Sequence, residues 1–228
     1  MLGIETATDV LSVGIVMDNK FVAERSVSGK KLHSVRLIPF IKNVLADAAL
    51  TLKDLDGIAV SNGPGSFTGI RLGVVTARTL AQVLDLPVVG ISTLLALAAP
   101  LLTGGIPVCA LIVSRRDEVY AGVYQAAGEV PSAVVPAFAA APADAAHRLQ
   151  SFQKVILTGE GAHTFRKTFE DTLGSRSLFA PETAHPQGTV IAGLGLIKLT
   201  SAGGSGYSEL LPEYFRPPAI TGGSYRDG

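Results

Sequence analysis

A short turn near the N-terminus carries the first side chains that could do chemistry. Glu5, Thr6 and Thr8 follow an apolar segment and precede a second one, so we expect them at the tip of a β-hairpin. Amides and hydroxyls in such a turn can hold a phosphate, and an acidic side chain beside them can bind Mg²⁺ through water. A threonine-rich turn without any ligand is the simpler interpretation.

A glycine-rich turn precedes the second predicted helix and suggests a place for an anion. It reads Gly63-Pro64-Gly65-Ser66-Phe67-Thr68-Gly69, with Arg71 just inside the helix. Threonine at position 68 breaks the Gly-x-Gly-x-x-Gly pattern, and no Gly-Lys-Ser/Thr follows, so neither nucleotide-binding motif is present. A close-packed turn, with Ser66 or Thr68 capping the helix, is the competing interpretation.

The histidines do not follow a metal-binding pattern. The fourth residue after His33 is Leu37, and neither His-x-x-x-His nor His-Glu-x-x-His occurs in the sequence. Gly-x-Ser-x-Gly, the turn that carries a nucleophilic serine, is also missing. We therefore expect no metal site and no catalytic residue, and we place His33 at a helix start or in an interface.

Two predicted helices carry more apolar and small side chains than one core face requires. The apolar residues of 33–49 cover an arc of about 220° on a helical wheel, whereas a core-facing stripe needs little more than about 100°. The helix at 70–84 has a small residue at every fourth position. We predict a partner interface on this helix pair; packing in the protein's own core is the alternative. The predicted interface residues are His33, Leu37, Phe40, Ile41, Val44, Gly73, Ala77 and Ala81.

Strands and helices alternate along the chain, which predicts an α/β fold with parallel strand pairs. The apolar strand, polar turn and alternating strand of residues 2–17 recur at 108–124, which suggests a duplicated unit. We expect an N-terminal half at 1–105, a C-terminal half at 106–215 and an extended tail at 216–228. Residues 126–150 are expected to form an irregular edge strand and a short helix.

The composition restricts the class of protein. The 228 residues carry 19 basic and 19 acidic side chains, and this zero net charge argues against an autonomous nucleic-acid-binding module. With 47% hydrophobic residues the chain is not disordered as a whole, and its one cysteine, Cys109, cannot form an internal disulfide. We recognise no leader peptide and no membrane span, so we expect a cytoplasmic protein.

The segment from Gly63 to Gly73 resembles the bacterial TsaB (YeaZ-like) family of tRNA modification proteins. The region 126–150 matches this family only by position. Other matching segments span most of the chain: Ile4-Glu5-Thr6-Ala7-Thr8, His33-Ser34, Leu37-Ile38-Pro39, Ser92-Thr93-Leu94, Arg115-Arg116-Asp117-Glu118-Val119-Tyr120, Gly159-Glu160-Gly161-Ala162 and Leu211-Pro212-Glu213-Tyr214-Phe215-Arg216.

The resemblance implies a duplicated actin-like ATPase (ribonuclease H-like) fold with two βββαβα-type halves, the second of them reduced. It also implies membership of the glycoprotease-like group, whose catalytic relative TsaD holds a metal through a His-x-x-x-His pair. Leu37 stands where the second histidine of that pair would be. The resemblance therefore implies a non-catalytic subunit required for N6-threonylcarbamoylation of the adenosine beside the anticodon in tRNAs reading ANN codons.

The same resemblance implies the partners and cofactors. TsaD is the expected main partner, bound through the first two helices, and TsaE, an ATPase, joins the two. A homodimer using the same surface is expected when the chain is alone, and tRNA is expected to bind only through the complex. No tightly bound cofactor is expected, while weak binding of ATP or ADP with Mg²⁺ at the subunit junction stays open.

Two positions depart from the family pattern. The family usually has Asp where Glu5 stands, and Asp-Ala-Arg where Ser114-Arg115-Arg116 stands. Loss of a carboxylate from the second hairpin argues against hydrolysis of Mg-nucleotide by this chain. The alternatives are an ATPase, kinase or M22-type peptidase of the actin-like fold that acts on its own, and a self-associating structural protein.

Overall fold

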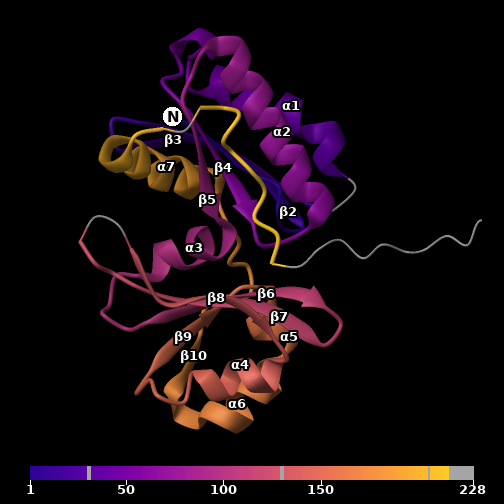
Figure 1. The fold of residues 1–228 in the computed structure, drawn as a ribbon, viewed down its shortest axis with the longest axis vertical. Coiled ribbons are helices and arrows are strands. Elements are labelled where there is room, and N and C mark those ends of the chain that lie inside the picture. The colour runs from indigo at the N-terminus through magenta and orange to yellow at the C-terminus, as the bar shows by residue number, and fades with distance from the viewer. Residues whose placement is uncertain (30–31, 129–130, 205, 216–228) are drawn as a thin grey trace, which may run out of the picture.

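The chain folds into two halves that lie one above the other in Figure 1. The computed structural model describes residues 1–29, 32–128, 131–204 and 206–215, and the predicted tail at 216–228 lies outside this part. Each half is built on one five-stranded sheet. No helix of the described part is long and apolar enough to cross a lipid bilayer.

The first sheet has the strand order β3-β2-β1-β4-β5. Its first three strands pair antiparallel, whereas β4 pairs parallel with both β1 and β5. The elements in chain order are β1 (Leu2–Glu5), β2 (Val10–Met17), β3 (Lys20–Ser28), α1 (His33–Asp47), the 3₁₀ turn Leu52–Asp54, β4 (Ile58–Gly63), α2 (Phe67–Leu84), β5 (Val88–Ser92), α3 (Thr93–Ala98) and the 3₁₀ turn Ala99–Leu101.

The second sheet repeats this arrangement as β8-β7-β6-β9-β10, which confirms the predicted duplicated α/β fold. Its edge strand β8 pairs with β7 with register shifts between Ala121 and Val123 and between Val123 and Tyr124, so the irregular edge strand that the sequence suggested is present. The reduction lies in length, since β9 and β10 have 4 and 3 residues. The elements are β6 (Val108–Arg115), β7 (Glu118–Gln125), β8 (Ser132–Ala140), α4 (Pro142–Arg148), β9 (Val155–Thr158), α5 (Glu160–Thr164), α6 (Arg166–Leu173), the 3₁₀ turn Gly174–Arg176, β10 (Ser177–Phe179) and α7 (Gly188–Ala202).

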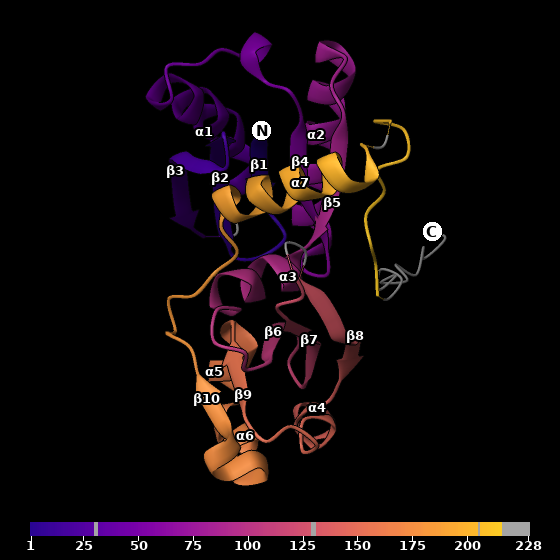
Figure 2. The same cartoon turned by 90° about the vertical axis from the view of Figure 1, so that its left-hand side faces the viewer.

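Helices cover both faces of the first sheet. Helices α1 and α2 pack on one face, and α7 lies across the strands of the other, as Figure 2 shows. Because both faces are covered, every residue of β1 and β4 is buried. This explains why both strands begin with continuous apolar runs, at residues 2–4 and 58–60, rather than with alternating patterns.

The position of α7 corrects the predicted domain boundaries. Although it follows the second half in sequence, α7 packs on β1, β2, β4 and β5 of the first. Its N-terminus is fixed there, because the Ser12 hydroxyl accepts a hydrogen bond from the Gly188 amide (2.9 Å) and Glu24 accepts one from the Thr189 amide (2.9 Å). A Cβ on Gly3 would overlap the Gly188 carbonyl, so the glycines allow this close approach. The range 106–215 is therefore not a separate structural half.

Helix α3 makes the reciprocal crossing. It follows β5 of the first sheet but packs on β6 and β7 of the second. Leu94 and Leu97 are buried there with Val108 and Ile112. The exchange of α3 and α7 joins the two halves through apolar packing.

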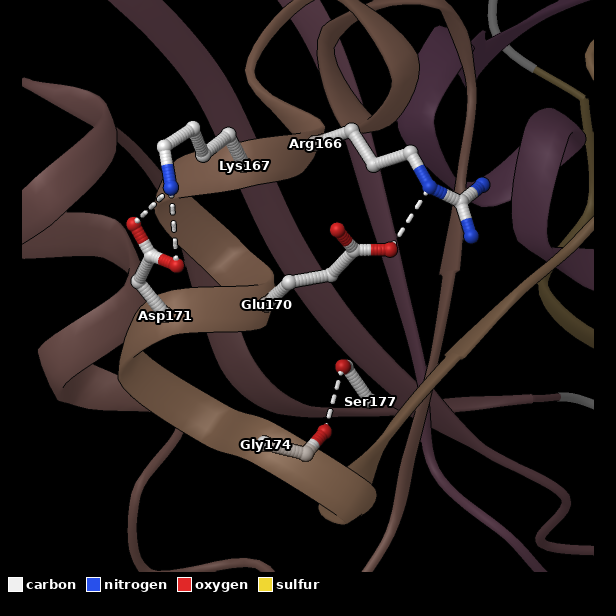
Figure 3. A network of polar contacts seen from close by, with 6 residues as sticks. All are labelled: Arg166, Lys167, Glu170, Asp171, Gly174 and Ser177. Carbon is white, nitrogen blue, oxygen red and sulfur yellow. Dashed lines mark hydrogen bonds and ion pairs between the residues drawn. The ribbon is translucent and has the colours of Figure 1, made fainter.

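Helix α6 carries the charged network shown in Figure 3. Arg166 pairs with Glu170 at 2.7 Å and Lys167 with Asp171 at 2.9 Å, both at i,i+4 spacing and both in contact with solvent. Exposed pairs of this type contribute only about 0.3–0.5 kcal/mol each to helix stability. We interpret this cluster as the solvated face of a helix, not as a reactive site.

Candidate functional site on the first hairpin and the α1–α2 face

The predicted hairpin is present, and internal hydrogen bonds hold its tip. Glu5 is the last residue of β1 and pairs across the ladder with Ser12. Its Oε1 accepts a hydrogen bond from the Thr8 amide at 2.9 Å. The Thr6 hydroxyl donates to the carbonyl oxygen of Gly69 at 2.7 Å. The Thr8 hydroxyl accepts a hydrogen bond from the Val10 amide at 3.3 Å, so the three predicted side chains lie together and each already binds another part of the chain.

Glu5 is the buried ionisable group of this hairpin. Burial raises the pKa of its carboxyl from 4.5 to about 7, although the nearby Ser61 hydroxyl and the amides of Thr8 and Ala7 oppose that change. Only the Thr8 amide makes a hydrogen bond of good geometry, and Oε2 has no partner. Desolvation outweighs hydrogen bonding here because the carboxylate lies away from water with half of its oxygens unpaired.

The glycine-rich turn is close-packed against this hairpin. The Ser66 amide donates to the Ala7 carbonyl at 2.7 Å, and the Ser66 side chain caps α2 by accepting from the Gly69 amide at 3.3 Å. Side chains are not tolerated at two of the glycines, because a Cβ on Gly65 or Gly69 would overlap the backbone carbonyl of Ala7 or Thr6. Gly65 also has a φ of +155°. Packing, rather than anion binding, therefore accounts for these residues of the motif.

The other end of the motif contacts the C-terminal segment. The peptide bond between Gly63 and Pro64 is cis, and the carbonyl of Glu213 lies directly against Gly63. One step earlier in β4, the Asn62 carbonyl accepts a hydrogen bond from the Glu213 amide at 2.7 Å. Residues 210–215, which we call the C-terminal strap, thus lie along the end of β4.

The strap adds an aromatic cluster that the sequence did not reveal. The ring of Tyr214 stacks on Phe67 with centroids 4.9 Å apart, and its hydroxyl accepts a hydrogen bond from Arg71 at 3.0 Å. Arg71 also lies over the Phe67 ring at 3.9 Å. Phe215 contacts Tyr120 of the second half, with centroids 5.9 Å apart. The sequence has aromatic residues at 67, 120, 214 and 215, but they are far apart along the chain and no local pattern links them.

His33 begins α1, as predicted, but its ring faces backbone rather than a partner. Nε2 lies 3.0 Å from the Thr8 carbonyl oxygen and Nδ1 lies 3.2 Å from that of Gly29. A neutral imidazole has one N–H and donates to one of these carbonyls, whereas an imidazolium donates to both. In either form the ring joins α1 to the first hairpin.

The predicted interface side chains are corrected to core positions. Leu37, Ile41 and Val44 of α1 are buried against the sheet together with Ala77 and Ala81 of α2. His33 and Gly73 are also buried, and a Cβ at position 73 would overlap the Thr6 hydroxyl. Phe40 is partly buried on the same core. The small-residue stripe therefore lets α2 approach its own sheet, which was the alternative interpretation.

The outward face of the same two helices is apolar as well. Val35 and Ile38 of α1 are 66% and 47% exposed, and Val75 and Val83 of α2 are 61% and 76% exposed. We call these four residues the α1–α2 face. The wheel assigned Val35 and Ile38 to the broad apolar arc but did not single out Val75 or Val83. The spacing of Arg71 and Val75 was the available signal, because residues four positions apart lie on the same side of a helix and an arginine usually faces solvent.

A cavity of about 350 Å³ lies between the halves beside the first hairpin. Thr8 and Asp9 line it from the first half, and Glu160 and Glu182 line it from the second. Within the described part of the chain, no group of three or more His, Cys, Asp or Glu side chains could hold a metal ion. The described residues of the cavity wall thus include several acidic residues and no arginine or lysine.

Comparisons with known proteins identify relatives over nearly the whole chain. The family model described as "TsaD: tRNA N6-adenosine threonylcarbamoyltransferase" matches residues 22–195. The "tRNA threonylcarbamoyladenosine biosynthesis protein TsaB" of Bacillus subtilis (strain 168) is 33% identical over 218 residues, which cover 95% of this chain and 93% of that protein.

Solved structures are also similar to this chain. A Pseudomonas aeruginosa protein described as similar to the peptidase YeaZ superposes with a TM-score of 0.82 at 26% identity, covering 94% of this chain and 98% of its own. Component A of the (R)-2-hydroxyglutaryl-CoA dehydratase of Acidaminococcus fermentans superposes with a TM-score of 0.54 at 12% identity, over 88% of this chain and 99% of its own. At that identity the second likeness concerns the fold alone.

Proposed function

This chain belongs to the TsaB family of tRNA threonylcarbamoyladenosine biosynthesis proteins, and on that premise we propose that it is a non-catalytic subunit of the machinery that makes this modification. Its role is to bind and support the catalytic subunit TsaD. TsaD transfers the threonylcarbamoyl group to the adenosine beside the anticodon, and TsaE completes the assembly.

The α1–α2 face is the observation that carries this proposal. Four aliphatic side chains from the two helices are exposed on it, although removing such groups from water would stabilise the protein. Exposed apolar side chains that gather in one patch mark protein-interaction sites, and we propose that these four form such a patch. We place the contact with TsaD here, on the outward side of the two helices that the resemblance indicated.

The charges around the face favour a heterologous partner over a second copy of this chain. Arg36 and Lys42 are exposed on α1, as is Arg71 on α2. The sequence of α2 contains no acidic residue, and Asp47, the acidic residue of α1, pairs with Arg25 at 2.8 Å. Two copies would bring like charges together, which weakens association, whereas a partner with an acidic rim complements the face. We therefore propose that the homodimer yields to the complex with TsaD.

Two observations support a non-catalytic role. Both ring nitrogens of His33 are directed at backbone carbonyls, so the histidine that aligns with the metal-binding pair of TsaD has no nitrogen free for a metal. In the described residues, no cluster of ligating side chains supplies another metal site. We infer that the metal and the reacting groups come from TsaD, and that tRNA reaches this chain only as part of the complex.

Reconstitution tests this role. TsaD, TsaE, tRNA, ATP and threonylcarbamoyl-adenylate are mixed with and without this chain, and modified adenosine is measured by mass spectrometry of the digested tRNA. We expect modification to depend on this chain, and we expect the chain alone to show no ATP turnover. Equal modification without the chain, or turnover by the isolated chain, would contradict the proposal.

A further inference from the structure

The amide and hydroxyl donors of the first hairpin are groups of the kind that can hold a phosphate. In this chain they are largely engaged. The Thr6 amide donates to the Ser61 hydroxyl at 3.4 Å, the Thr8 amide to Glu5 at 2.9 Å and the Val10 amide to the Thr8 hydroxyl at 3.3 Å. The Thr6 hydroxyl donates to the carbonyl of Gly69. An incoming phosphate oxygen therefore meets donors that already have acceptors.

Glu5 is the acceptor that most resembles a phosphate. Its carboxyl group is fully buried under the hairpin, and Oε1 accepts a hydrogen bond from the Thr8 amide at 2.9 Å, as a phosphate oxygen would. Oε2 is buried without a hydrogen-bond partner. We propose that the Glu5 carboxylate is a built-in occupant of the hairpin's anion site, so that this chain excludes a nucleotide phosphate from the place where the fold would otherwise receive one.

The length of the side chain makes this occupation possible. Glu5 reaches the amide three residues ahead, so the side chain folds back over the turn that it begins. An aspartate at position 5 is one methylene shorter, so we expect its carboxylate to fill the place of the Glu5 carboxylate less completely. Replacement of Glu5 by smaller residues should therefore vacate the site, whereas an isosteric replacement should not.

The surroundings also disfavour a nucleotide. Among the described residues, the acidic residues Asp9, Glu160 and Glu182 line the cavity beside Thr8, and no arginine or lysine does. The glycine-rich turn, which could have offered amides from the other side, is packed against the Thr6 and Ala7 carbonyls. Among the described residues, neither wall of the site thus supplies a set of free donors for a phosphate group. Occupation of the hairpin by Glu5 does not depend on binding of TsaD. An experiment can therefore contradict this proposal without contradicting the proposed function, and the reverse also holds.

Binding of inorganic phosphate tests the occupation, with chloride at equal ionic strength as the reference. We expect phosphate to leave the Tm of the wild type and of Glu5→Gln unchanged, because an amide oxygen in place of Oε1 still takes the Thr8 N–H. In Glu5→Ala we expect millimolar phosphate to raise the Tm by about 2–4 °C. A phosphate-dependent rise in the wild type, or none in folded Glu5→Ala, would overturn the proposal.

A second measurement covers the case in which Glu5→Ala does not fold. The amide resonance of Thr8 is followed by ¹⁵N–¹H NMR in the wild type and in Glu5→Asp while phosphate or ADP is added, with and without Mg²⁺. We expect the Thr8 resonance to stay in place in the wild type and to move in Glu5→Asp. Movement in the wild type, or the same lack of response in both proteins, contradicts occupation by Glu5.

Discussion

The hydroxyl of Thr6 donates a 2.7 Å hydrogen bond to the carbonyl of Gly69, and this contact joins the first hairpin to the start of α2. It brings the two motifs that suggested phosphate chemistry into mutual contact. The Thr6 hydroxyl and the Ser66 amide, two donors that could have bound a phosphate, instead bind backbone carbonyls of the other motif. The pair therefore stabilises the chain's own fold.

The close packing of Gly69 on Thr6 gives the first prediction. Gly69→Ala should lower the free energy of unfolding by about 2–3 kcal/mol, because the added methyl overlaps the Thr6 carbonyl. Helix propensity alone predicts the opposite sign, a gain of about 1 kcal/mol. Gly104→Ala is the matched control, since nothing lies within 4 Å of the added methyl, and urea unfolding measures both variants. Equal stability of the two variants would contradict the packing.

The raised pKa of Glu5 leads us to expect that the free energy of unfolding falls as the pH rises toward 7. The folded chain holds the Glu5 proton more tightly than the unfolded chain, so the penalty of burying its charge is absent below pH 4.5 and complete above about pH 7. Relative to Glu5→Gln, the wild type should lose about 3 kcal/mol of unfolding free energy as the pH rises through this window. Urea unfolding at several pH values measures the difference, and parallel curves for the two proteins would refute it.

The C-terminal strap predicts a long-range contribution to stability. Tyr214→Ala removes the stacking on Phe67 and the hydrogen bond from Arg71, and should cost about 1–2 kcal/mol. Tyr207→Ala is the control, because Tyr207 has nearly the same exposure, 41% against 38%. Thermal unfolding compares the two variants. If both lose the same stability, the aromatic cluster does not hold the strap.

The apolar arc of α1 and the small-residue stripe of α2 show what a sequence pattern can predict about a site. The excess of apolar residues indicated apolar side chains on more than one side of α1, and the structure has them on both its buried and its exposed side. A helical wheel cannot tell the inward side from the outward side when both are apolar, so Leu37 and Ala77 were assigned to a partner although they contact the sheet. The burial of each side chain had to be known before Val35 and Val75 could replace Leu37 and Ala77 as candidate interface residues.

Long-range docking explains the other differences. Alternation of strands and helices was enough to predict the α/β fold, and the hairpin of residues 2–17 that recurs at 108–124 suggested its duplication. The assignment of α7 to the second half was wrong, because its docking depends on pairs such as Gly3 with Gly188, and the fit of two glycines distant in sequence leaves no local pattern. The contact of Phe215 with Tyr120 is of the same kind.

The correction of the interface predicts two different outcomes for a new charge. Val44→Glu and Ala77→Glu should lower stability by several kcal/mol, because each places a carboxylate in the core without a partner. Val75→Glu should leave the Tm nearly unchanged, because residue 75 is exposed. Circular dichroism during heating compares the three variants. A folded, stable Val44→Glu protein would contradict the placement of α1.

The affinity of this chain for TsaD tests the central claim most directly. Isothermal titration with TsaD from the same organism compares the wild type, Ile38→Glu, Val75→Glu and the control Val134→Glu, which alters an exposed valine (40%) on β8 of the second half. We predict that both variants on the α1–α2 face bind at least about tenfold more weakly, a loss of about 1.4 kcal/mol, while the control binds as the wild type does. Unchanged affinity of Ile38→Glu and Val75→Glu would contradict the assignment of the α1–α2 face to TsaD.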